Sequence, residues 1–260
     1  MGVVNVTPDS FSDGGRTLDP KAAVDRAKAL IEEGADILDL GAESSRPGAR
    51  AVSAEEELSR LMPVLGALSD CPIPISVDTV KPEVMRAAIA AGAAMINEIG
   101  ALRAAGALEA VAASDVGVCL MHMQGEPRTM QQEPRYRDVV AEVGAFLVER
   151  VAAAESAGIA RDRIAIDPGF GFGKTVAHNF ELLRNLDRFA ALGLPVLAGW
   201  SRKSTLGAIT GRGAEDRLAA SLAAALLAVQ RGAKILRVHD VAATRDALAV
   251  LAALEEKPGG

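Results

Sequence analysis

The sequence repeats one short unit along almost its whole length. In each unit a helix-forming segment ends near a glycine, and a short run of apolar, often β-branched residues follows. Glycine tolerates the left-handed conformation that closes a helix, so each unit is typical of a helix, its cap and a strand. The apolar runs lie at residues 3–4, 35–40, 73–77, 93–96, 118–121, 164–166, 195–198 and 235–238.

Short, continuously apolar strands that alternate with helices indicate a parallel sheet that is buried on both faces. About eight such units in a chain of 260 residues predict a closed (β/α)8 barrel, the TIM barrel. An open, doubly wound α/β sheet is the alternative fold on this pattern. Since no linker interrupts the repeats, we expect residues 1–260 to form a single domain.

Residues that start and cap helices predict several boundaries. Pro20 and Pro82 suit the first turn of a helix, where an N–H group is not needed. Ser53 and Glu56 have the spacing of a capping box. An apolar stripe with helical spacing lies between Asp138 and Gly158.

Composition excludes several functional classes. Aromatic residues are 3% of the chain and the net charge is −6, which argues against a nucleic-acid partner. The start of the chain lacks the basic segment of a secretory signal, and the longest apolar run, Leu218–Val229, is too short to span a membrane. Cys71 and Cys119 lack metal-ligand spacing and predict reduced thiols. We therefore expect a cytoplasmic protein without a nucleic-acid or membrane partner.

Nearly every predicted strand ends in a polar side chain. Such residues are expected wherever strands leave a core, but Asp78, Asn97 and Asp167 directly follow apolar runs, where an unpaired polar group costs several kcal/mol. In a barrel all of these strand ends face one mouth, where active sites lie. The strand-end residues are Asn5, Glu43, Asp78, Asn97, His122, Asp167, Ser201 and His239.

The cations near the strand ends predict an anion site. Arg46, Lys203 and Arg237 follow three of the predicted strands, and with His239 they would surround one mouth. The alternative is that each is a solvated surface charge. His122 and His178 have no such neighbours and are interpreted as structural or surface residues. The sequence shows no cluster of His, Cys and carboxylates, so we do not expect a tightly bound zinc ion.

Two glycine-containing loops have open interpretations. Residues 169–175 resemble a phosphate-binding loop, but Pro168 stands where a Walker A motif requires glycine, which excludes a nucleotide hydrolase of that type. From its residues alone this loop is either a simple turn or part of a binding lid. Residues 7–17 are long and polar and contain Gly14 and Gly15, so they predict a mobile lid or a surface loop.

Several motifs, in this order, resemble those of the dihydropteroate synthase family. They are NVTPDSFSDGG at 5–15, SRPG at 45–48, DPGFGFGK at 167–174, SRK at 201–203 and RVHD at 237–240, with support from Asn97 and from MHMQG at 121–125. The resemblance implies that the barrel joins 6-hydroxymethyl-7,8-dihydropterin diphosphate to p-aminobenzoate, giving 7,8-dihydropteroate and pyrophosphate. It also implies that the pterin–diphosphate bond breaks ahead of amine attack.

The resemblance also implies roles for individual residues. Asp167 would accept two hydrogen bonds from the pterin edge, with Asp78, Asn97, Met121 and Lys203 around the ring. Asn5 would bind Mg²⁺, the expected cofactor. Arg46, Arg237 and His239 would hold the diphosphate, and Ser45, Pro47, Phe172, Ser201 and Lys203 would line the p-aminobenzoate pocket. Catalytic roles are implied for Asp78, Lys203, Arg237 and His239.

Two alternative functions would use the same carboxylates to bind a pterin: a pterin-binding methyltransferase and a non-catalytic pterin-binding homologue. The first would not need the SRK motif or the diphosphate residues, and the second would be expected to lose the cations. The family resemblance also implies a homodimer, with which the apolar segment 218–229 agrees. Ala42, Ser45, Glu98 and Trp200 depart from common family residues and affect expected affinity more than the expected reaction.

Overall fold

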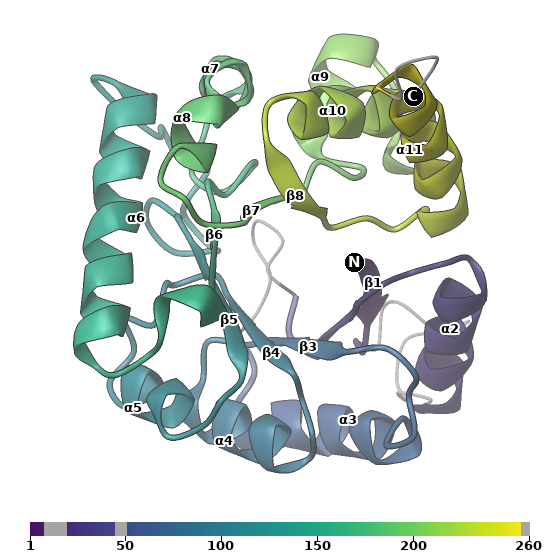
Figure 1. The fold of residues 1–260 in the computed structure, drawn as a ribbon, viewed down its shortest axis with the longest axis vertical. Coiled ribbons are helices and arrows are strands. Elements are labelled where there is room, and N and C mark those ends of the chain that lie inside the picture. Colours follow the sequence, from purple (N-terminus) through teal and green to yellow (C-terminus); the bar gives the residue numbers. More distant parts are fainter. Residues whose placement is uncertain (8–19, 45–50, 256–260) are drawn as a thin grey trace, which may run out of the picture.

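Eight parallel strands follow one another around a barrel in chain order (Figure 1). The computed structural model describes residues 1–7, 20–44 and 51–255. Each strand pairs with the next one along the chain, from β1 to β8. The strands are β1 Gly2–Asn5, β2 Leu38–Gly41, β3 Ile75–Asp78, β4 Met95–Glu98, β5 Gly117–Met121, β6 Ile164–Asp167, β7 Val196–Ala198 and β8 Ala233–Leu236.

The first and last strands meet and close the sheet. A parallel bridge joins Gly2 to Val238, just beyond β8. The N–H of Val3 donates to the Val238 carbonyl at 3.0 Å, and the N–H of Val238 donates to the Met1 carbonyl at 3.0 Å. This closure confirms the predicted (β/α)8 barrel over the open sheet.

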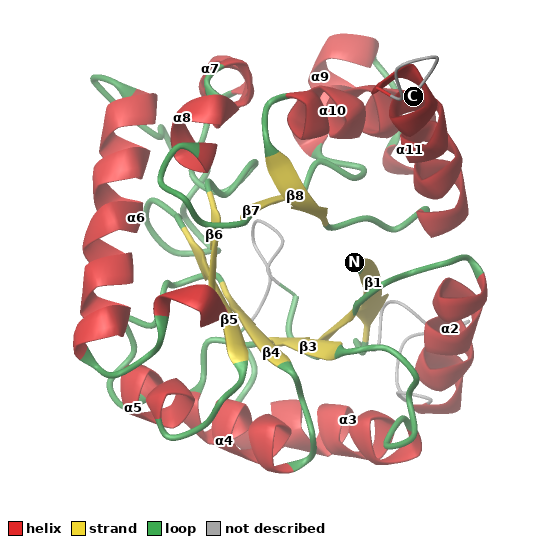
Figure 2. Ribbon diagram, in the orientation of Figure 1, coloured by secondary structure: helices red, strands yellow, loops and turns green. Residues whose placement is uncertain are grey.

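Helices form the outer layer around the strands (Figure 2). Pro20 and Pro82 begin helices as predicted, and Asp138 caps the helix that ends before Gly158. No helix among the described residues is long and apolar enough to cross a membrane. The helices are α2 Pro20–Glu32, α3 Ala54–Ala67, α4 Pro82–Ala90, α5 Ala107–Ala112, α6 Val139–Ser156, α7 Val176–Arg184, α8 Leu186–Ala190, α9 Ser204–Thr210, α10 Leu218–Gln230 and α11 Val241–Glu255.

The predicted capping box at the start of α3 is only half formed. Ser53 Oγ accepts from the N–H of Glu56 at 3.1 Å, as expected for the helix cap. The Glu56 carboxylate, however, bonds to the guanidinium of Arg60 one turn later. A cation is a stronger partner for a carboxylate than a neutral N–H group. A complete box occurs instead at Thr175 and His178, at the start of α7.

Side chains alternate between the helix layer and the barrel interior along each strand. In β2, Leu38 and Leu40 belong to the large apolar core between strands and helices. Between them, Asp39 is fully buried and reaches residues of β4 and the end of β8 across the barrel. A small apolar cluster that includes Cys119 and Leu197 fills the interior near the start of the strands. Asp78 and Asp167 are the last residues of β3 and β6, at the opposite ends of the strands.

Candidate active site

The carboxyl ends of the strands surround a cavity of about 520 Å³. A neighbouring cavity of about 600 Å³ shares Asn5, Arg202 and His239 with it. The structure thus brings most of the predicted site residues together at one mouth. Those that line the first cavity are Asn5, Asp78, Asn97, Met121, Asp167, Phe172, Ser201, Lys203, Arg237 and His239. Ser45, Arg46, Pro47 and most of the predicted lid lie outside the described residues.

A buried charge network joins β2, β3, β4 and the end of β8. Arg237 Nε donates to Asp39 Oδ2 at 2.6 Å, and Arg237 Nη2 donates to Asp78 Oδ2 at 3.1 Å. Asn97 Nδ2 donates to the same Asp39 oxygen at 3.2 Å. Asp39 Oδ1 has no hydrogen-bond partner among the described residues. Two carboxylates and one amide thus fix Arg237 in the wall of the cavity.

Asp39 is a site residue that sequence reasoning missed. It is the second of the four residues of β2, so a search confined to strand ends misses it. The signal was present in the sequence, since a carboxylate between Leu38 and Leu40 must face the interior of a barrel. A buried carboxylate at such a position needs a cation, and Arg237 supplies it.

Burial brings several pKa values in the cavity towards neutrality. It raises the pKa of Asp167 to about 6, although the N–H of Gly169 and the charge of Lys203 oppose the shift. It lowers the pKa of Lys203 to about 8, with a further contribution from Arg237. Burial also raises the pKa of Asp78, while Arg237 opposes that shift. Such perturbed groups in one cavity are typical of a functional site.

The described part of the cavity also has an apolar wall. Met121, at the end of β5, packs in a cluster with Ile99 and Met130, and Phe172 packs against that cluster. The ammonium of Lys203 lies 4.1 Å from the centroid of the Phe172 ring, within the range of a cation–π contact. An apolar wall close to Asp167 and Lys203 suits a flat, polar ring with hydrogen-bonding edges.

Three contacts hold the SRK segment in an unfavourable backbone conformation. Arg202 has a φ of 59°, which is uncommon for a residue other than glycine. Its N–H donates to Ser221 Oγ at 3.0 Å, and its carbonyl accepts from Arg217 Nη1 at 3.0 Å. Its guanidinium binds both carboxylate oxygens of Asp240. The sequence motif therefore combines two cavity residues, Ser201 and Lys203, with a middle residue that shapes the turn.

Ser201 and His239 contact each other at the edge of the cavity. Ser201 Oγ lies 2.9 Å from His239 Nδ1 and accepts from the His239 backbone N–H at 3.1 Å. The His239 carbonyl accepts from Arg26 Nη2 at 2.7 Å. Ser201 thus contacts His239 at its ring and its backbone N–H, and Arg26 holds the His239 carbonyl.

The glycines after β6 are required by close backbone packing. Gly169 has a φ of +73°, and a Cβ atom there would lie 1.9 Å from the His122 carbonyl oxygen. A Cβ atom at Gly173, with a φ of +62°, would lie 2.5 Å from the Gln124 carbonyl oxygen. Gly169 N–H also donates to Asp167 Oδ1 at 2.7 Å. The loop therefore packs against the end of β5 and orients the Asp167 carboxylate.

Two residues that depart from common family residues support the structure behind the cavity. Trp200 is buried, and its ring lies 4.6 Å from that of Phe170. The Glu98 carboxylate accepts from the backbone N–H groups of Gly100 and Leu102. These side chains therefore act through packing and loop geometry.

The fold and the cavity define a barrel enzyme with a polar site at the carboxyl ends of its strands. The family described as pterin binding enzymes matches residues 1–239. Over 97% of its length the chain is 51% identical to the dihydropteroate synthase of Escherichia coli K12, of which it covers 90%. It is 52% identical to that of Neisseria meningitidis serogroup B, with 98% and 92% of the two chains covered. The chain belongs to the dihydropteroate synthase family.

Solved structures agree with the sequence relatives. Dihydropteroate synthase of Xanthomonas albilineans with 4-aminobenzoic acid is 59% identical, with a TM-score of 0.94 over 99% of this chain and 93% of that one. The same enzyme in complex with 7,8-dihydropteroate is 57% identical, with a TM-score of 0.90 over the same shares. The Yersinia pestis enzyme in a sulfonamide complex has a TM-score of 0.94 at 43% identity, over 98% and 94% of the two chains.

The glycine loop allows a matched test. Gly169 and Gly193 have the same φ of +73°, but a Cβ atom at Gly193 would meet nothing within 4 Å. We expect Gly193→Ala to cost only the backbone strain, about 1–2 kcal/mol of unfolding free energy. Gly169→Ala adds a clash with the backbone of His122 and should cost at least about 2 kcal/mol more. Urea denaturation of both variants measures the difference, and equal losses would contradict the close packing of this loop.

Proposed function

We propose that this protein is a dihydropteroate synthase that joins 6-hydroxymethyl-7,8-dihydropterin diphosphate to p-aminobenzoate. The observation that carries the proposal is the meeting of a buried carboxylate, Asp167, with Lys203, Arg237 and His239 in one cavity. A pterin needs the carboxylate, and a departing diphosphate needs the cations. Family membership and the complexes of relatives with p-aminobenzoate and dihydropteroate support the same reaction.

The pterin ring would bind between the polar and apolar walls of the cavity. Its N3–H and 2-amino groups are neighbouring donors that match the two oxygens of the Asp167 carboxylate. Asp78 and Asn97, whose side chains are linked through Arg237 and Asp39, would meet other nitrogens of the ring. Phe172 and Met121 offer apolar contacts, and Lys203 lies where it could reach the ring carbonyl.

The residues around the diphosphate would act mainly on the leaving group. As the bond between the pterin methylene and the diphosphate breaks, negative charge grows on the diphosphate oxygens. Arg237 and His239, with Arg46, would stabilise that charge. The p-aminobenzoate nitrogen then bonds to the methylene and loses a proton. Since an aromatic amine needs little activation against such a carbon, the site needs no Ser-His-Asp or Cys-His arrangement.

A magnesium ion fits this site only together with the substrate. The described residues contain no group of three or more His, Cys, Asp or Glu that could hold a metal by themselves. Asn5 lines both cavities beside His239 and offers one neutral amide oxygen. Magnesium commonly combines few protein ligands with phosphate oxygens and waters, so Asn5 would hold the ion against the diphosphate. Bound there, it would neutralise charge on the leaving group.

The second substrate would enter beside Ser201, Phe172 and Lys203. Ser45 and Pro47, which the family resemblance also implies for this pocket, lie outside the described residues. Ser201 contacts His239, so this pocket lies next to the proposed diphosphate site. The free cysteines Cys71 and Cys119 fit the reducing cytoplasm, where folate precursors would be joined.

The reaction can be tested by pyrophosphate release. The purified protein with the pterin diphosphate and Mg²⁺ should release pyrophosphate in proportion to added p-aminobenzoate, and chelation of Mg²⁺ should slow release at least about tenfold. A pterin-binding methyltransferase or a non-catalytic homologue would release none. Pyrophosphate release without p-aminobenzoate dependence would show hydrolysis and contradict the proposal.

Asp167→Asn tests the pterin contact. The amide places a donor against a pterin donor, so pterin affinity should fall by roughly 2–5 kcal/mol. Because the pKa of Asp167 is about 6, the wild type should also lose affinity as the pH falls below that value, when the carboxylate is protonated. Calorimetry with 6-hydroxymethylpterin measures both effects, with the exposed Asp70→Asn as the control. Affinity of Asp167→Asn within threefold of the wild type would contradict the assignment.

We further propose that two copies of the chain associate through α10 and α11. Leu218 and Leu227 of α10 are partly exposed, and Val250 and Leu254 of α11 are 73% and 76% exposed. Val250 and Leu254 are four residues apart, on one face of α11, and α11 packs against α10. Exposed apolar residues gathered in this way are typical of an interface between subunits.

A charge placed in this region should separate the subunits. We expect Val250→Glu to sediment as a monomer at concentrations at which the wild type is a dimer. Val148→Glu is the matched control, because Val148 is 49% exposed on α6, which lies away from α10 and α11 (Figure 1). A monomeric wild type, or a dimeric Val250→Glu protein, would contradict this interface.

A further inference from the structure

Lys174 is a buried cation next to the cavity, and the proposed reaction does not use it. It is 3% exposed and follows the glycine loop. Its ammonium lies 3.0 Å from His122 Nδ1, 2.9 Å from the Phe172 carbonyl oxygen and 3.3 Å from the His122 carbonyl oxygen. These three acceptors match the three donors of an ammonium. None of them carries a negative charge, so the cost of burying this cation is met by neutral groups.

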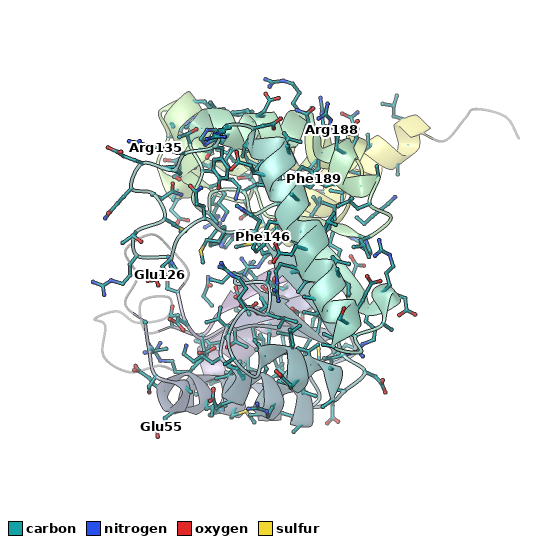
Figure 3. The ribbon with its side chains drawn as sticks, turned by 90° about the vertical axis from the view of Figure 1, so that its left-hand side faces the viewer. Glu55, Glu126, Arg135, Phe146, Arg188 and Phe189 are labelled. Atoms are coloured by element: carbon teal, nitrogen blue, oxygen red, sulfur yellow. The ribbon has the colours of Figure 1, made fainter. Side chains whose placement is uncertain are left out.

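The His122 ring is neutral and accepts a hydrogen bond from Lys174 in this arrangement. Burial lowers the pKa of His122 to about 3, and the charge of Lys174 adds to that effect. A neutral ring that accepts from Lys174 at Nδ1 carries its proton on Nε2. The ring packs against that of Phe146 in a T-shaped arrangement at a centroid distance of 4.9 Å. Phe146 lies on α6 (Figure 3). The sequence predicts a structural or surface role for His122; it is buried, which excludes the surface alternative, and it contacts Lys174.

Lys174 also lies close to the carboxylate that the pterin would meet. Its ammonium is 3.3 Å from the position that a Cβ atom on Gly169 would occupy, and the N–H of Gly169 bonds to Asp167. Burial lowers the pKa of Lys174 to about 7, and the negative charge of Asp167 opposes this shift. In return, Lys174 favours the ionised form of Asp167.

The same ammonium fixes the loop between Asp167 and α7. By bonding to the carbonyls of His122 and Phe172, it joins the end of β5 to the loop. Three further bonds hold the loop elsewhere: from Tyr136 Oη to the Gly173 carbonyl, from Gln131 Nε2 to the Gly171 carbonyl, and from the Gly171 N–H to Asn179 Oδ1. Lys174 donates to the carbonyl of Phe172, whose own N–H donates within the loop to the Gly169 carbonyl at 3.1 Å. The Phe172 ring contacts Lys203 in the cavity.

We propose that Lys174 is a positioning residue for pterin binding, which keeps Asp167 ionised and holds Phe172 in the wall of the cavity. This inference rests on the proposed contact between Asp167 and the pterin. An ionised carboxylate accepts from both pterin donors, whereas a protonated one presents a donor of its own to them. A cation behind the carboxylate therefore extends pterin binding to lower pH without touching the pterin.

Other charged groups face this pair and set the background of its titration. On the cavity side Asp167 faces Lys203 and Arg237, and the buried Cys119 thiol of β5 lies near it. Lys174 also faces Lys203, and its charge reaches His178 of α7. All of these groups remain in a Lys174 variant. A change in the pH at which pterin affinity is lost therefore reports the missing charge of Lys174.

Lys174→Met tests the charge, because methionine has a similar length and no charge. We expect the midpoint of the acidic loss to move up by at least about half a pH unit, so that 6-hydroxymethylpterin affinity at pH 6 falls at least about twofold. Lys174→Arg should keep the wild-type midpoint. Lys234→Met is the matched control, since Lys234 is exposed on β8. A Lys174→Met protein with the midpoint and affinity of the wild type would overturn the proposal.

A measurement on the wild type covers the case in which Lys174→Met does not fold. Pterin binding stabilises the ionised Asp167 and must therefore raise the pKa of Lys174. NMR titration of ¹³C-lysine-labelled protein, read at the lysine with a nuclear Overhauser effect to the His122 ring, should show that rise. An unchanged titration on pterin saturation would overturn the inference. Loss of affinity in Asp167→Asn without an effect at Lys174 would leave the proposed function intact.

Discussion

Arg237 and the carboxylates of Asp39 and Asp78 form the interaction on which the rest of the site depends. Burial of a guanidinium in a barrel is unfavourable, and the two carboxylates offset it strongly enough to raise the pKa of Arg237 above its ordinary value. The three residues come from β2, β3 and the end of β8, so their bonds cross the closure between the last strand and the first ones. The geometry of the cavity and the closure of the barrel therefore depend on the same contacts.

Burial also explains how a few side chains could both bind a neutral ring and stabilise a leaving anion. Exposed carboxylates and lysines would be fully charged and strongly hydrated at neutral pH. In this cavity the pKa of Asp167 is about 6 and that of Lys203 is about 8, so both groups are charged at pH 7 but close to changing state. Each charge then depends on its neighbours, and the charge of Lys174 behind Asp167 becomes effective because so little water screens it.

The fold could be predicted because the repeat of helix, glycine and strand extends along the whole chain. Some strand-end residues could be predicted because a carboxylate directly after an apolar run, as at Asp167, is costly unless it has a partner. Asp39 could not be found by that rule, because it lies inside a strand and only the alternation of side chains reveals its direction. The turn at Arg202 depends on Ser221, Arg217 and Asp240, which no local pattern connects with it.

Buried charged groups that are only partly compensated by their neighbours connect stability with binding. Asp39 Oδ1 has no hydrogen-bond partner in the described part of the chain, and Lys174 donates only to neutral acceptors. These groups lower the stability of the free protein, and the apolar core between strands and helices offsets that loss. A ligand that supplies donors to Asp167 strengthens the charge pair with Lys174 and so favours the folded state. The arrangement that weakens the empty barrel is therefore the one that makes its mouth selective for a ring with paired donors.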